Sequence, residues 1–254
     1  MTGSAAAAPP RVLLVTRNFP YISQTFIADR GCPPETSHRV IPGGVDLDYF
    51  DPGKRPQPGI AGDRERPLRI LSVGRLVWTK GHDLAIEALR ILVDLGIDAT
   101  LTIVGGGAMV DELRFAAWDL GVFDRVHLAG SLPRRRVRAA MKQADVFLAA
   151  SYSEGFGISV LEAQAMQLPV VCTDADGLKE NVVDGKTGFV VPRREAAPLA
   201  DRLALLARAP KLRASMARAG RERVAQHFRI DQDIDAFEWL YYDAIEANRC
   251  AGQA

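Results

Sequence analysis

The stretch Asp145-Val146-Phe147-Leu148-Ala149-Ala150 leads, after two residues, into Ser153-Glu154-Gly155-Phe156-Gly157-Ile158-Ser159-Val160-Leu161-Glu162-Ala163. The first run is short and apolar, and the second passes from glycine and polar residues into a helical pattern, so together they predict a strand, a loop and a helix. Gly155 and Gly157 would let the backbone approach a ligand closely. The start of the helix offers unpaired N–H groups and a positive dipole end, which suits a phosphate group.

Two glutamates, Glu154 and Glu162, stand on this stretch with seven residues between them. Glu162 is expected more than one turn inside the helix, where its carboxylate could accept hydrogen bonds from ligand hydroxyls. The alternative is that Glu154 only favours the helix dipole and that Glu162 is an ordinary surface residue. Short motifs arise by chance, so this stretch alone leaves both readings open.

The composition is that of an ordinary soluble globular protein. The 254 residues are 48% apolar and 25% charged, and they allow one large domain or two small ones. The net charge of +1 gives no field that would attract nucleic acid or an anionic membrane. Three scattered cysteines and four histidines predict a reducing compartment, no disulfide framework and no zinc site. The start of the chain lacks a signal-peptide core, so a cytoplasmic protein is expected.

From Leu68 onward, short apolar segments alternate with amphipathic ones. This alternation predicts a protein of the α/β class, with a parallel, Rossmann-like sheet covered by helices on both faces. The expected strands are 69–73, 100–104, 126–128, 146–149, 169–172 and 188–191. Beside the helix that opens after Gly157, the expected helices are 84–95, 110–120, 137–143, 195–207, 211–227 and 232–247. Before Leu68, short strands are expected at 12–15 and 38–42, and residues 51–67 are expected to form a linker or exposed loop.

Glycine-containing loops follow four of the expected strands: Gly74-Arg75, Gly105-Gly106-Gly107, Gly130-Ser131 and Glu154-Gly155. Ligands of open parallel sheets bind outside the carboxyl ends of the strands, so all four loops should line one edge. Lys80 lies just beyond the first loop, and its ammonium group, together with the Arg75 guanidinium, could neutralise a diphosphate. The alternative is a pair of solvated surface cations.

Several other functions lack their motif. The run Val104-Gly105-Gly106-Gly107-Ala108-Met109-Val110 fails the dinucleotide pattern, because Val110 stands where the third glycine belongs. The chain has no P-loop and no Gly-x-Ser-x-Gly, so an ATPase or a hydrolase triad has no anchor. The dense basic run Arg134-Arg135-Arg136-Val137-Arg138 is expected to be the exposed face of a helix start rather than a nucleic-acid site.

From about Arg39 to Ile245 the chain resembles the donor half of the retaining family 4 (group 1) glycosyltransferases of the two-domain GT-B type. The matching marks are Val40-Ile41-Pro42-x-Gly44-Val45-Asp46, Gly74-Arg75, Lys80-Gly81, Val104-Gly105-x-Gly107, Gly130, Ser151, Glu154-Gly155-Phe156-Gly157 through Glu162-Ala163, Pro169-Val170-Val171, Glu180 and Asp184-Gly185-x-x-Gly188.

The resemblance implies a role for each matched residue. Arg75 and Lys80 would hold the diphosphate of a UDP-sugar or GDP-sugar, Glu154 would contact the donor sugar, and Glu162 would bind the ribose hydroxyls. Glu154, Arg75 and Lys80 are thereby the expected catalytic residues. The expected donor-binding positions are Arg75, Lys80, Gly105, Gly155, Phe156, Gly157, Ile158 and Glu162. Cations and helix-start amides would stabilise the departing diphosphate, so no metal ion and no cofactor beyond the donor are expected.

The front of the chain departs from the family pattern. Residues 12–15 and 19–27 resemble the first strand and helix of the acceptor domain, although Gln24 stands where a glutamate is usual, and the rest of that domain is missing. The expected division is an acceptor-domain remnant and junction at 1–37, a donor domain at 38–230, and a crossover helix and tail at 231–254.

Three functions stay open at this point. The first is a hexosyltransferase acting on a glycan or lipid-linked saccharide, active alone or with a partner that supplies the acceptor half. The second is a non-catalytic nucleotide-sugar-binding remnant or subunit, and the third is a related GT-B epimerase. The aromatic segment 235–245 is expected to pack on its own domain, on another domain, or on another chain, including a second copy. The resemblance also admits a peripheral position at the inner membrane face.

Overall fold

The structure of the protein is a computed structural model that describes residues 43–54 and 59–251. The strands expected at 12–15 and 38–42 and the acceptor-domain remnant lie outside the described residues. The division at 38 and 231 therefore stays a prediction.

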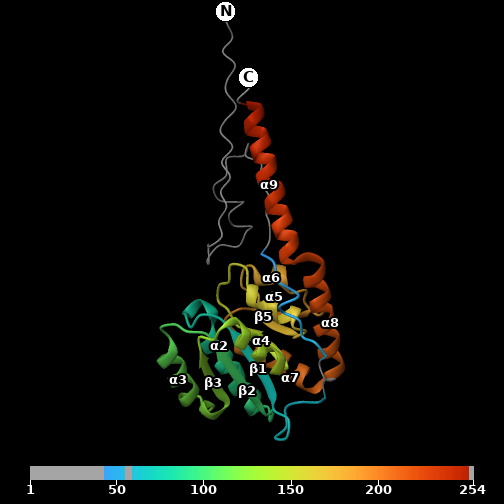
Figure 1. Cartoon of the computed structure of the whole chain (residues 1–254). Coiled ribbons are helices and arrows are strands. Elements are labelled where there is room, and N and C mark those ends of the chain that lie inside the picture. The colour runs from blue at the N-terminus through green and yellow to red at the C-terminus, as the bar shows by residue number, and fades with distance from the viewer. Residues whose placement is uncertain (1–42, 55–58, 252–254) are drawn as a thin grey trace, which may run out of the picture.

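The centre of the molecule is a six-stranded parallel sheet with the strand order β3-β2-β1-β4-β5-β6 (Figure 1). The strands are β1 (Leu68–Val73), β2 (Ala99–Val104), β3 (Val126–Gly130), β4 (Val146–Ala149), β5 (Val170–Thr173) and β6 (Gly188–Val191). The chain builds outward from β1 to β3 and then crosses to the other side of β1, where β4 begins the second half. This reversal between β1 and β4 is the topological switch point at which open α/β sheets bind ligands.

Helices cover both faces of the sheet, as predicted. The helical segments are η1 (Trp78–Lys80), α2 (His82–Asp94), α3 (Val110–Asp119), η2 (Phe123–Arg125), α4 (Arg134–Gln143), α5 (Ile158–Ala165), α6 (Leu178–Asn181), α7 (Ala196–Arg208), α8 (Pro210–His227) and α9 (Ile230–Ala251). Buried residues of α2, α3 and α7 pack on one face and those of α4 and α5 on the other, while α8 contributes Met216 to the first core and Val224 to the second.

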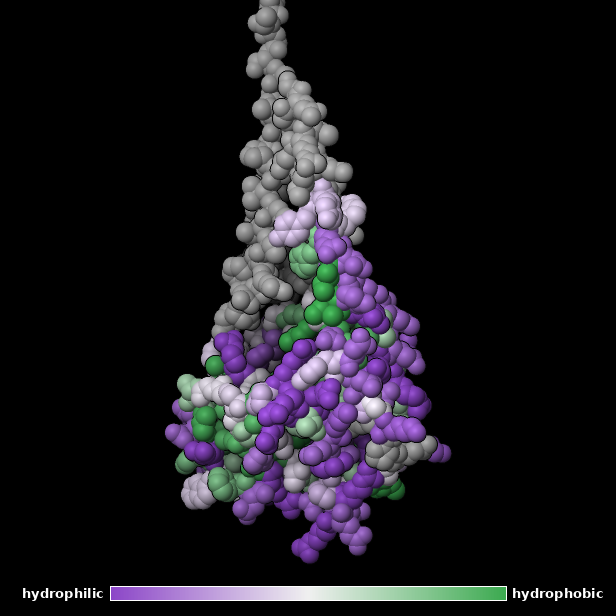
Figure 2. Space-filling view, in the orientation of Figure 1, coloured by the Kyte–Doolittle hydropathy of each residue, from purple (hydrophilic) through white to green (hydrophobic). Residues whose placement is uncertain are grey.

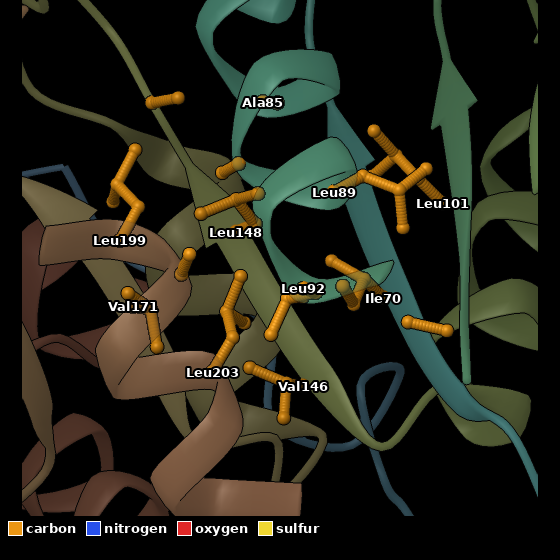
Figure 3. Packing of buried hydrophobic residues seen from close by; sticks show 14 of the residues in the cluster. Ile70, Ala85, Leu89, Leu92, Leu101, Val146, Leu148, Val171, Leu199 and Leu203 are labelled. Carbon is orange, nitrogen blue, oxygen red and sulfur yellow. The ribbon is translucent and has the colours of Figure 1, made fainter. Parts of the chain in front are cut away.

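Consecutive strand residues supply these two cores because side chains alternate across a strand. Ile70 belongs to the core under α2 and α7, whereas its neighbour Leu71 belongs to the core under α4 and α5. Figure 3 shows Leu89 of α2 and Leu203 of α7 packed over the strands. Each fully buried side chain of this size contributes about 1.5–3 kcal/mol of hydrophobic stabilisation.

Three details differ from the sequence predictions. Helix α4 begins at Arg134, three residues before the range 137–143, and so agrees with the prediction that the basic run is the exposed face of a helix start; Pro133, directly before it, is extended. The short helix α6 was not predicted, since four residues are too few to show a helical period. Residues 59–67 lack regular structure, as expected, but Ala61 is buried in the core, so this part is not a free linker.

The first described segment is joined to the far end of the domain. Val45 N–H donates to Phe228 O at 2.8 Å, and Ile230 N–H donates to Val45 O at 3.2 Å. These bonds fasten residues 43–46 to the junction between α8 and α9. From this junction α9 extends away from the body of the domain (Figure 1).

Candidate functional site

Loops that follow β1, β2 and β3 lie side by side at the carboxyl edge of the sheet. Leu76 N–H donates to Gly106 O at 2.9 Å, and Gly105 N–H donates to Gly130 O at 2.9 Å. The loop after β4 joins them, because the amides of Tyr152 and Ser153 both donate to a carbonyl of the β1–α2 loop, Thr79 O. The structure therefore brings together all four loops that the sequence predicted at one edge.

Two glycines make this approach of the loops feasible. Gly105 has a φ of +154°, and a Cβ on it would overlap Gly74 O. Gly81 has a φ of +59°, and a Cβ on it would overlap Ala150 O. Both positions need a residue without a side chain, since L-residues rarely adopt these φ values and neither space admits a methyl group.

Lys80 and Glu154 meet between the first and fourth loops. The Lys80 ammonium donates to the Glu154 carboxylate, and their side chains are only 21% and 11% exposed. Lys80 is thus not a solvated surface cation, and Glu154 does more than favour a helix dipole. Arg75 lies exposed on the same loop as Lys80.

The backbone that carries Arg75 is held by a buried histidine. His82 Nε2 lies 3.2 Å from Arg75 O, and His82 Nδ1 lies 3.4 Å from the Ser72 hydroxyl oxygen. Burial lowers the pKa of His82 to about 4, so the ring is neutral at physiological pH. A carbonyl only accepts, so the proton sits on Nε2 and the serine donates to Nδ1. His82 thus has a local hydrogen-bonding role in the β1–α2 loop.

The start of α5 presents a run of unpaired amides. Its N-cap is Gly157, with a φ of +77° and no side-chain cap. Within the described ranges, the backbone amides of residues 155–159 meet no acceptor. Unpaired helix-start amides carry partial positive charge, so this loop can receive an anion or an oxygen lone pair.

Glu162 lies on the second turn of α5 and is half-buried. Burial raises the pKa of its carboxyl to about 7, and the positive charge of Arg134 opposes this rise only in part. Any ligand that donates hydrogen bonds to the Glu162 carboxylate would stabilise its ionised form. Two vicinal hydroxyls would do so.

The basic run at 134–138 has a structural contact of its own. The Arg134 guanidinium lies 4.4 Å from the Tyr49 ring centroid, and Arg138 donates to Tyr49 O at 2.7 Å. These contacts hold α4 against the first described segment. Over the described residues no group of three His, Cys, Asp or Glu side chains could hold a metal ion, and no helix is long and apolar enough to cross a membrane.

Residues 54–223, more than half of the chain, match the family model "Glycosyl transferases group 1". The chain belongs to this family. The group 1 chain is 37% identical over 206 residues to the putative colanic acid biosynthesis glycosyltransferase WcaL of Salmonella typhimurium, covering 78% of this chain and 49% of that protein. It is 35% identical over 211 residues to a GDP-mannose-dependent alpha-(1-6)-phosphatidylinositol monomannoside mannosyltransferase of Mycobacterium tuberculosis, with 78% and 54% covered.

Solved structures of other proteins have the same fold as the described residues of this chain. The C-terminal domain of a group 1 glycosyl transferase (LpcC) from Francisella tularensis is similar over its whole length and over 74% of this chain, with a TM-score of 0.64 and 28% identity. Anabaena HepE in complex with UDP and glucose has a TM-score of 0.72 and 22% identity, covering 87% of this chain and 60% of HepE. The described domain is the Rossmann-like, C-terminal domain of the GT-B fold. The group 1 chain spans about half the length of the curated relatives it matches.

The predicted donor-binding positions gather as follows in the group 1 chain. Lys80 and Glu154 touch, Gly105 lies against the β1 loop, and residues 155–158 lead into α5, which carries Glu162. The Phe156 ring packs 6.2 Å from the Phe228 ring rather than standing free. Their roles toward a donor stay predictions.

The sequence patterns did not predict the residues after β5 and β6 that support the loop between β4 and α5. They are Asp176, Gly177, Asn181 and Arg193. The only signal for the first two was an Asp-Gly pair of the kind that marks a turn, and it says nothing about what the turn contacts.

Proposed function

We propose that the chain binds a nucleotide-diphosphate sugar at the carboxyl edge of its sheet. In this proposal it is the donor half of a metal-independent, retaining hexosyltransferase. The observation that carries the proposal is the convergence of Lys80, Glu154 and the unpaired amides of residues 155–159 from different loops. Cations and amides suit a diphosphate, and carboxylates suit sugar hydroxyls, so one site offers both chemistries.

Binding would change the partner of Lys80. Its ammonium is paired with the Glu154 carboxylate in the structure. A diphosphate carries more negative charge than one carboxylate, so Lys80 would turn to it together with Arg75, and Glu154 would accept from the hydroxyls of the donor sugar. Glu162 would bind the ribose, with its carboxylate ionised by the two hydroxyl donors.

Transfer would then need no protein nucleophile. The bond between the anomeric carbon and the diphosphate oxygen breaks, and its electron pair stays on the diphosphate. The acceptor hydroxyl bonds to the anomeric carbon on the same face and loses its proton to the departing diphosphate. In this proposal Arg75, Lys80 and the α5 amides would face the oxygen on which this negative charge develops and would lower the barrier by stabilising it.

The relatives support the donor and acceptor classes. One is named for GDP-mannose and a phosphatidylinositol mannoside, another for colanic acid, and HepE was solved with UDP. We propose a UDP- or GDP-hexose as donor and a glycan or lipid-linked saccharide as acceptor. A cytoplasmic location, with a peripheral position at the membrane, belongs to the same proposal.

The acceptor half would cover α9. Ile230, Ile234 and Tyr241 recur at helical spacing on one face of α9 and are 42%, 52% and 48% exposed. Figure 2 shows hydrophobic residues gathered at the base of α9, above a mostly hydrophilic face. We propose that this stripe packs on an acceptor domain, in the same longer protein or in a partner chain. A second copy is the competing occupant, and sedimentation over a concentration series tests it, because a dimer would dissociate on dilution.

The second candidate function is a donor-binding module without transfer activity. The observation that favours it is that the described residues form the C-terminal domain, whose groups suit donor binding. It shares the same site, so only a turnover measurement separates the two.

Calorimetric titration with UDP, GDP, UDP-glucose and GDP-mannose tests the proposal. The native chain should bind UDP and UDP-glucose, or GDP and GDP-mannose. Lys80→Ala and Glu162→Ala should weaken that binding. Lys211→Ala, at an exposed lysine on α8, is the matched control and should bind like the native chain. No binding by the native chain would refute the donor site. Binding without hydrolysis or transfer, with an acceptor half supplied, would favour the second candidate.

A further inference from the structure

The donor loop at residues 152–156, which follows β4, is fastened by residues that follow the next two strands of the sheet, β5 and β6. Three alternate carbonyls each accept one hydrogen bond. Arg193 donates to Tyr152 O at 3.2 Å, Gly177 N–H donates to Glu154 O at 3.0 Å, and the Asn181 amide donates to Phe156 O. Arg193 follows β6, and the other two donors follow β5. The loop therefore rests on elements that contribute no residue to the predicted donor site.

Asp176 bonds both a side chain and a backbone amide of this loop. Its Oδ2 accepts from the Ser153 hydroxyl at 2.7 Å and from Glu154 N–H at 3.3 Å. Its Oδ1 accepts from Arg193 at 3.2 Å. Burial opposes ionisation, but the hydrogen bonds from Ser153 and Arg193 outweigh it and hold the pKa of Asp176 below its usual value. The carboxylate is thus ionised and keeps all its acceptor sites at neutral pH.

The backbone at this position is specialised for the contact. Asp176 has a φ of +37°, in the left-handed region that few residues other than glycine, asparagine and aspartate adopt. A Cβ on the next residue, Gly177, would overlap Gly155 O. Unusual backbone of this kind persists only where the surroundings enforce it, and it gathers at functional sites.

The donor loop needs such support because it cannot hold its own shape. Gly155 and Gly157 flank Phe156, and glycine has no conformational preference that would fix the direction of the neighbouring amides. Both backbone polar groups of Glu154 are bonded to 176–177. Those two bonds set the orientation of the Glu154 residue and so aim its carboxylate at Lys80 rather than at solvent.

We propose that Asp176 is a positioning residue for the donor sugar. It does not touch the sugar, but it holds the Ser153 hydroxyl and the Glu154 amide so that the Glu154 carboxylate faces the sugar. This role rests on the proposed function, because it assumes that Glu154 is the sugar contact. Binding to a preorganised loop does not cost the entropy of ordering that loop. Breaking the hydrogen bonds of Asp176 to the loop should therefore lower the affinity for the sugar part of the donor.

Asp176→Asn is the central variant. Asparagine tolerates the left-handed backbone, but its amide can replace only one of the two carboxylate oxygens. Asp176→Gly is the second variant, since it keeps the backbone conformation and removes the carboxylate entirely. Asp174→Asn is the matched control: Asp174 bonds the same Arg193 guanidinium at 3.0 Å, but neither Ser153 nor Glu154.

The first measurement is amide hydrogen exchange on the ligand-free chain. Both Asp176 variants should speed exchange at the Glu154 amide by about tenfold or more, because a bond to a charged acceptor is lost. Exchange at Leu76 on the β1–α2 loop should not change. If exchange at the Glu154 amide is unchanged in both variants, Asp176 does not hold the loop, whatever the binding measurements show.

The second measurement is calorimetry with UDP and GDP, compared with UDP-glucose and GDP-mannose. In both variants the affinity for UDP-glucose or GDP-mannose should fall about fivefold to tenfold. The affinity for UDP or GDP, which lack the sugar, should change by less than about twofold. Equal losses for both ligands, or the same loss in Asp174→Asn, would overturn the positioning role. A native chain that binds none of the four nucleotides refutes the proposed function itself. A native chain that binds them, with variants that bind equally well, refutes the role of Asp176 alone.

Discussion

Replacing Glu162 by glutamine is expected to stabilise the ligand-free protein above pH 7 and to weaken donor binding there. The carboxyl has a folded-state pKa of about 7 against an ordinary value of 4.5, because α5 carries it into a half-buried position. The folded chain therefore binds the proton more tightly than the unfolded chain. The stability that this proton brings is complete below pH 4.5 and is lost as the pH rises through 7.

The size of the effect follows from the shift in pKa. A difference of this size corresponds to about 3 kcal/mol between the two protonation states, so ionised Glu162 destabilises the fold by up to that amount. Glutamine keeps the shape without the charge. We expect Glu162→Gln and the native chain to have equal free energies of unfolding near pH 4.5, and the variant to be more stable by about 2–3 kcal/mol at pH 8.

Donor binding should show the opposite preference, because ribose hydroxyls donate to the ionised carboxylate. With a pKa of about 7, the ionised fraction, and with it the donor affinity of the native chain, rises about tenfold between pH 6 and pH 8. The variant should bind more weakly at pH 8 and show no such rise.

Urea unfolding at a series of pH values measures the stability, and calorimetry in buffers of different ionisation enthalpy counts the protons released on binding. Glu112→Gln, at an exposed glutamate on α3, is the control and should match the native chain throughout. Equal stability of Glu162→Gln and the native chain at pH 8 would refute the burial argument. A native affinity that does not vary between pH 6 and pH 8 would refute the ribose contact.

Three further outcomes are expected. Lys80→Ala should lower the affinity for UDP or GDP by about tenfold to a hundredfold, because a hydrogen bond to a charged group contributes about 1.5–3 kcal/mol. An unchanged affinity in calorimetric titration would contradict the role of Lys80 toward the diphosphate. Leu89→Ala, at a fully buried position of α2, should lower the free energy of unfolding by about 2–5 kcal/mol in urea, whereas Leu95→Ala, at a 49% exposed position, should change it by less than about 0.5 kcal/mol. Gly81→Ala should cost at least about 1 kcal/mol by the same assay, because its left-handed backbone and the carbonyl oxygen beside it leave no room for a methyl group; a neutral result would contradict the close approach of the two loops.

The strands and helices of the described domain were predictable because each has a local signal. Apolar runs such as Ile70-Leu71 predicted strands buried on both faces, and helical spacing of Leu84, Leu89 and Leu92 predicted α2. Where the signal was absent the prediction failed. Apolar spacing placed the start of α4 only at 137, although the basic run 134–138 indicated a helix start, and α6 is shorter than one period of the pattern.

The gathering of the site at one edge was also predictable, since parallel strands end on the same side and the glycine-containing loops follow them. The chemistry within the site was not. Lys80 and Glu154 are 74 positions apart, and nothing in either local sequence states that they touch. The same holds for Asp176 and Ser153, which are 23 positions apart on loops after different strands.

The amino-acid sequence by itself determined the class of fold, the edge at which the glycine-containing loops meet and the residue types available there, because these depend on local period and on the direction of the strands. Only the tertiary structure decided that Lys80 neutralises Glu154, that burial raises the pKa of Glu162 to about 7, and that Asp176 holds the donor loop. Hydrogen bonds, ion pairs and desolvation depend on distances of a few ångströms between residues remote in the chain, and those distances exist only once the chain has folded.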